Sequence, residues 1–142
     1  MVLGSLIMAD PGFQFSFPAP ARIWSTNDER KMHYMEVREL IDAWKGATKL
    51  LYQSTCAARQ VSRRQPPSIV RLTIPIKTKV RRDPHNYCGS VLKAVIDGMV
   101  KGGAWEDDTP EWVDHYQPVF EHEGLVKVEL WPMPSSLLLK RN

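Results

Sequence analysis

The spacing of apolar residues changes along this chain, and this change narrows the possible folds more than any other feature. Residues 13–17 alternate phenylalanine with polar residues, which is typical of a half-buried strand. From 29 to 58 the apolar residues recur every three or four positions, which predicts one long helix capped by Asn27 or Asp28. A strand followed by a long helix is therefore the expected start of the fold.

The second half of the chain repeats the same change of period. Residues 68–79 alternate as a half-buried strand, in which Pro75 indicates an edge position or a bulge. The other expected elements are a helix over 87–101 that stops at Gly102-Gly103 and strands over 112–119 and 125–131. This order predicts an α+β fold: a single domain with a small mixed β-sheet covered by two helices.

The length of 142 residues suits one domain with a real core. We expect residues 13–134 to form that domain, 1–12 to be a flexible extension and 135–142 to be a tail. Cys56 and Cys88 have no paired spacing, which argues against a disulfide scaffold and favours a reduced, cytoplasmic setting. No run of the sequence is apolar for long enough to predict a membrane segment.

Charge is distributed unevenly along the chain. Residues 43–82 contain ten basic residues and no acid, whereas residues 83–125 contain nine acids against Lys93 and Lys101. This asymmetry indicates a polyanionic partner, of which nucleic acid is the commonest kind. Two solvated faces of opposite sign are the alternative reading of the same counts.

Ionisable side chains flank the second expected helix. Asp83 and His85 precede it, and Asp107 and Asp108 follow it after a glycine turn. Carboxylates are the ligands that Mg²⁺ prefers, and the neighbouring arginines can hold phosphates. Both signs of charge together are typical of metal-assisted attack on a phosphodiester.

A polar stripe is expected along that helix. At about 100° per residue, Asn86, Ser90, Lys93 and Asp97 project on one side. Lys93 and Asp97 lie four residues apart and can pair. The stripe meets the acidic pair only if the loop after Gly103 folds back along the helix.

Three short motifs in this region resemble the RusA family of Holliday junction resolvases. That family carries an arginine-rich strand end with Asp-x-Asp-Asn, then Lys-Ala-x-x-Asp, then Gly-x-Trp-x-Asp-Asp. The corresponding segments are Arg81-Arg82-Asp83-Pro84-His85-Asn86, Lys93-Ala94-Val95-Ile96-Asp97 and Gly103-Ala104-Trp105-Glu106-Asp107-Asp108. The chain departs from the family pattern in having His85 in place of the second acid and an extra helical turn before Lys93.

The resemblance implies a site and a cofactor. Asp83 and Asp108 would be metal ligands, with His85, Asp97 and Asp107 as further candidates, and Lys93 would face the scissile phosphate. The implied cofactor is Mg²⁺, with Mn²⁺ as the alternative because histidine prefers softer ions. The residues expected to contact DNA are Lys77, Lys79, Arg81, Arg82, Asn86, Arg63 and Arg64.

Each site residue also has a simpler interpretation. Asp83 is a possible helix cap or a partner of Arg82, Asp108 a cap, His85 a surface residue, and Lys93 an ion-pair partner of Asp97. The implied activity is a structure-selective endodeoxyribonuclease that resolves four-way junctions in DNA recombination and repair, as a homodimer, in a bacterial or phage-infected cell. The alternatives are a branched-DNA-binding protein without activity and a general nuclease on the same fold.

Overall fold

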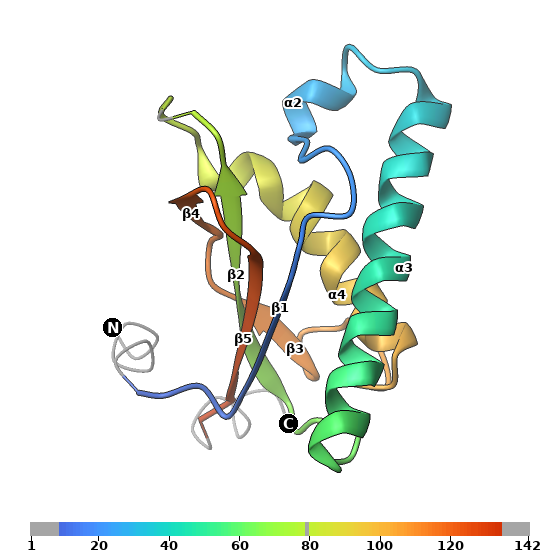
Figure 1. The fold of residues 1–142 in the computed structure, drawn as a ribbon, viewed down its shortest axis with the longest axis vertical. Coiled ribbons are helices and arrows are strands. Elements are labelled where there is room, and N and C mark those ends of the chain that lie inside the picture. Colours follow the sequence, from blue (N-terminus) through green and yellow to red (C-terminus); the bar gives the residue numbers. More distant parts are fainter. Residues whose placement is uncertain (1–8, 79, 135–142) are drawn as a thin grey trace.

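The computed structural model describes residues 9–78 and 80–134, which fold around a five-stranded mixed sheet (Figure 1). The strands are β1 (Phe13–Phe17), β2 (Ser68–Ile76), β3 (Val113–His115), β4 (Val119–His122) and β5 (Val126–Pro132). The helices are α2 (Thr26–Glu29), α3 (Tyr34–Arg59), the 3₁₀ helix η1 (Pro84–Tyr87), the π-helix η2 (Cys88–Leu92) and α4 (Lys93–Lys101). The predicted α+β class with a mixed sheet is confirmed, while most of the two predicted terminal segments lies outside the described residues.

Strand β2 is the centre of the sheet. It pairs antiparallel with β5, and β5 pairs antiparallel with β1; on its other side β2 runs parallel to β3 and β4. Because it has neighbours on both sides and is buried on both faces, the prediction of a half-buried strand was wrong. Pro75 lies past Thr73, where the pairing with β5 ends, so the strand is open on that side there.

The predicted strand over 112–119 is in fact two strands. Both β3 and β4 run parallel to β2, and the Tyr116 N–H between them donates to the Val70 carbonyl at 2.9 Å. Pro118, just before β4, has no N–H to offer a continuous ladder. The chain then turns through Glu123 and Gly124, both with positive φ, and passes the end of β2 to reach β5.

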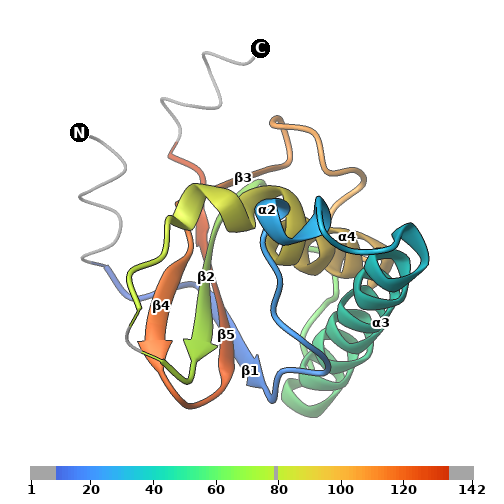
Figure 2. The same ribbon diagram turned by 90° about the horizontal axis from the view of Figure 1, so that it is seen from above.

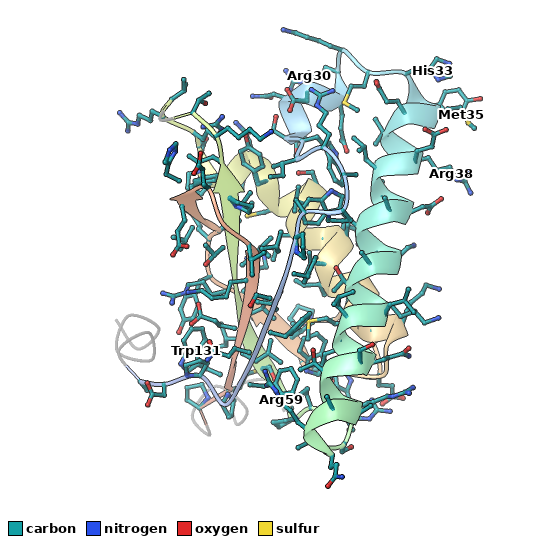
Figure 3. The ribbon with its side chains drawn as sticks, in the orientation of Figure 1. Arg30, His33, Met35, Arg38, Arg59 and Trp131 are labelled. Atoms are coloured by element: carbon teal, nitrogen blue, oxygen red, sulfur yellow. The ribbon has the colours of Figure 1, made fainter. Side chains whose placement is uncertain are left out.

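The predicted long first helix is also interrupted. Ser25 caps α2 through a capping box with Asp28, and a second cap, His33, starts α3 by accepting a hydrogen bond from the Met35 N–H. Neither Asn27 nor Asp28 is the N-cap residue. Figure 3 shows His33 and Met35 at the start of α3 and Arg59 at its other end.

Helices α3 and α4 cover the same face of the sheet (Figure 2). Phe13, Phe15 and Phe17 point into this layer, where Trp44 and Tyr52 of α3 are fully buried. The two covering helices predicted from the sequence are thus confirmed. None of the helices in the described part of the chain is long and apolar enough to cross a lipid bilayer.

Candidate active site

One residue of the predicted polar stripe, Asp97, and one of the predicted acidic pair, Asp108, meet at Lys93. Its ammonium nitrogen lies 3.5 Å from an oxygen of Asp97, one turn along α4, and 3.5 Å from an oxygen of Asp108. All three side chains are accessible, with exposed fractions of 59% for Lys93, 28% for Asp97 and 41% for Asp108. Two carboxylates therefore face one point on the surface, with a cation between them.

The loop after α4 folds back because two of its residues are held in the core. Gly103 has φ of 98°, which reverses the chain, and the Ala104 N–H donates to the Met99 carbonyl at 2.9 Å. Trp105 is buried, and its indole N–H donates to the Pro66 carbonyl at 3.1 Å. This anchored tryptophan places Asp108, three residues later, beside Lys93.

Asp83 begins the helical segment that leads to Lys93. Its carboxylate accepts the His85 N–H at 3.0 Å and so caps the 3₁₀ helix η1, as the simpler interpretation of this residue predicts. Within the described ranges it forms no ion pair with Lys93 or Arg82. The Asp83 residue is exposed.

His85 and Asp107 are exposed, and neither contacts Lys93 among the described ion pairs. Asp107 accepts the Asp108 N–H at 2.8 Å, so it shapes the loop that carries Asp108. Asn86 is partly buried in η1, where its N–H donates to the Asp83 carbonyl at 3.1 Å. These three residues thus have local structural roles in addition to any functional one.

Ser90 does not belong to the polar stripe. The helix changes from 3₁₀ to π to α geometry between Pro84 and Lys101, so a constant 100° per residue does not hold before Lys93. Ser90 is buried in the π-helix and donates its hydroxyl to the Trp24 carbonyl at 2.8 Å. Sequence reasoning missed this positioning role, and only the two apolar residues that follow Ser90, Val91 and Leu92, indicated that it lies near the core.

The carboxylates fit a magnesium ion in one respect. The described residues contain no group of three or more His, Cys, Asp or Glu side chains arranged to hold a metal. Mg²⁺ is commonly held by only one or two carboxylates together with substrate phosphates. Asp97 and Asp108, which converge on Lys93, meet that smaller requirement.

The predicted DNA-binding cations fall into two groups. Arg63 packs beside the Gly103 turn, and the Gln65 N–H donates to the Ala104 carbonyl at 2.8 Å, so the linker with Arg63 and Arg64 runs along the acidic loop. Lys77, Arg81 and Arg82 follow the end of β2. Lys79 lies outside the described residues.

These cations differ in whether they already form hydrogen bonds or ion pairs with other groups of the protein. Arg82 donates to the Thr78 and Val80 carbonyls and to the Thr78 hydroxyl at 2.9 to 3.1 Å, so it closes the loop between them. Four others form no ion pair with any described carboxylate: Arg63, Arg64, Lys77 and Arg81. Arg59, a neighbour of the first group, lies instead over the Phe13 ring at 5.1 Å (Figure 3).

Comparison with known proteins assigns this chain to no family. No model of a known protein family matches the chain, and no curated protein matches it.

Proposed function

We propose that this protein is a structure-selective endodeoxyribonuclease that resolves four-way DNA junctions by metal-dependent hydrolysis. One observation carries the proposal: Lys93 lies 3.5 Å from both Asp97 and Asp108. Two motifs that are separate in the sequence, each similar to a resolvase motif, thereby form one exposed cluster. Four of the predicted DNA-binding cations form no ion pair with a described carboxylate, which supports a polyanionic substrate.

The chain's own residues have distinct roles in this proposal. Asp108 and Asp97 would hold the ion, and Asp83, His85 and Asp107 would be further candidates from the motif alone. A bound Mg²⁺ or Mn²⁺ would supply an activated water and polarise the phosphate. Lys93 would neutralise charge on the non-bridging phosphate oxygens, because its ammonium faces the same point as the carboxylates.

The cations would bind the DNA backbone rather than read its sequence. Phosphate contacts give affinity that falls steeply with salt and carry no base information. A four-way junction has approximate twofold symmetry, so we propose a homodimer with two sites on opposite strands. Recombination and repair in a bacterial or phage-infected cell is the setting in which such junctions arise.

A second candidate is a branched-DNA-binding protein without activity. Two features of η1 favour it. His85 stands where the resolvase motif has an acid, and the Asp83 carboxylate caps the helix by accepting the His85 backbone N–H. Such a protein would keep the cations and bind junctions without cutting them.

A labelled four-way junction incubated with Mg²⁺ or Mn²⁺, beside a plain duplex, tests both candidates. The resolvase is expected to cut the junction and leave the duplex, and Asp108→Asn is expected to lower cleavage at least about 100-fold while junction binding persists. Asp42→Asn, which changes an exposed acid on α3, is the matched control and should cut normally. Binding with no cleavage in either metal favours the second candidate, and equal cutting of duplex favours a general nuclease.

A further inference from the structure

A groove is lined by residues of the loop before α2, the end of β2 and η1. These three segments lie at the same end of the molecule (Figure 1). Its volume is about 910 Å³, within the range of sites that enclose small ligands. The floor is aliphatic and includes Ile23, Pro75 and Ile76. The polar lining includes three cations (Arg22, Lys77 and Arg82), two acids (Asp28 and Glu123) and the Tyr87 ring.

The wall formed by residues 19–23 is held in place from two directions. Trp44 of α3 donates its indole N–H to the Arg22 carbonyl at 3.0 Å. Ser90 of the π-helix donates its hydroxyl to the Trp24 carbonyl at 2.8 Å. Trp24 and Trp44 are themselves completely buried, so the groove is formed before any ligand enters and little ordering would oppose binding.

An aromatic ring shares this lining with three cations and two acids, so the cations are in excess by one. Tyr87 is partly exposed, and its ring is set by an edge-on contact with Phe120, with the centroids 5.1 Å apart. Lys77 forms no ion pair among the described residues, and Arg22 has only a long one, 3.9 Å to Asp28, between two well-exposed side chains. An aromatic face with adjacent cations is the combination by which proteins hold an unpaired nucleotide: the base stacks and the phosphate binds the cations.

The groove and the candidate active site are close in the sequence. Tyr87 ends the 3₁₀ helix that Asp83 caps, and the next segment leads through Ser90 to Lys93. Ser90 thus joins the groove wall to the helix that carries the site.

We propose that this groove binds one unpaired nucleotide of the DNA substrate, with its base against Tyr87 and its phosphates on Arg22 and Lys77. The proposal rests on the proposed function in one respect, that DNA is the substrate. It adds a reason for selectivity, because branched DNA offers unpaired nucleotides at the crossover more readily than intact duplex does.

The test is binding of a labelled short single-stranded DNA, measured by fluorescence anisotropy in EDTA so that cleavage plays no part. Tyr87→Leu, which keeps apolar bulk but removes the aromatic face, should weaken binding about fivefold or more, whereas Tyr87→Phe should bind normally. Arg22→Ala and Lys77→Ala should each make the negative slope of log K against log salt shallower by about 0.7. Lys49→Ala, an exposed cation on α3, is the control and should leave the slope unchanged.

The outcomes separate this proposal from the function on which it rests. Unchanged binding in Tyr87→Leu, with thermal melting showing an intact fold, would overturn the groove proposal even if junctions are cut. Tyrosine-dependent binding by a protein that cuts no junction in Mg²⁺ or Mn²⁺ would support the groove and overturn the nuclease. If the wild-type protein cuts junctions but does not bind the single-stranded DNA, the groove proposal is overturned and the proposed nuclease function is not.

Discussion

Gly98 of α4 lies directly against the backbone of Lys45 in α3. A β-carbon added at Gly98 would lie 2.6 Å from the Lys45 carbonyl oxygen and 2.8 Å from the β-carbon of Thr48. No side chain fits at that separation, so the two helices approach this closely only because the residue is glycine. Since Lys93 and Asp97 are carried by the same helix, this contact also sets the position of the candidate active site.

Gly98→Ala is therefore expected to destabilise the protein. The methyl group must push α4 away from α3, which should lower the free energy of unfolding by about 1–3 kcal/mol. Gly46→Ala in α3 is the matched control: nothing lies within 4 Å of its added β-carbon, so the better helix former should add about 0.5–1 kcal/mol. Urea unfolding of both variants measures the difference, and equal stability would contradict the close contact.

Lys93→Ala should separate a chemical role from a structural one. Its two ion pairs are exposed, so their loss should change the free energy of unfolding by no more than about 1 kcal/mol. Under the proposed function, junction cleavage should fall about 100- to 1,000-fold because charge on the phosphate is no longer neutralised. Unfolding curves and single-turnover cleavage together give the test, and unchanged cleavage would remove Lys93 from the mechanism.

Arg71 and Glu129 form an ion pair on the face of the sheet opposite α3 and α4. The distance from Nη2 of Arg71 to Oε1 of Glu129 is 2.8 Å, and Glu129 is only 5% exposed. The Arg71 guanidinium also lies 5.3 Å from the centre of the Trp131 ring. Arg71→Met should destabilise the protein by about 3–5 kcal/mol, since it leaves a buried carboxylate without its partner. The double variant Arg71→Met with Glu129→Leu should recover most of that loss in thermal or urea unfolding. A single variant as stable as wild type would show that the pair is not buried in solution.

The Cys88 thiol should react slowly with alkylating agents. Burial raises the pKa of this thiol, and the negative charge of Asp83 raises it further. A raised pKa leaves less thiolate at any given pH, so iodoacetamide at pH 8.5 should modify Cys88 more slowly than a cysteine in an unstructured peptide. Asp83→Asn removes the second cause but keeps an oxygen that can cap η1, and should speed the reaction. Peptide mass spectrometry follows the site, and a slower reaction in Asp83→Asn would falsify the assignment.

Local patterns were enough to predict several elements of the fold. The alternating phenylalanines of β1 and the glycine stop after α4 follow from short-range rules, and both match the structure. The break between α2 and α3 was missed because His33 is an uncommon cap, weaker as a signal than Asn27 or Asp28. The π-helix before Lys93 was missed because a constant turn per residue was assumed, and this placed Ser90 on the wrong face.

Apolar periodicity and charge clusters follow from the order of the amino acids alone, and they define the elements and the acids and cations available to a site. The contact of Asp108 with Lys93 does not follow from that order, because it depends on Trp105 being buried against the linker at Pro66, far away in the chain. The same holds for the groove beside Tyr87, whose wall is fixed by Trp44 and Ser90 from two different helices. Contacts between distant segments are set by packing of the whole core, and no periodicity within one segment records them.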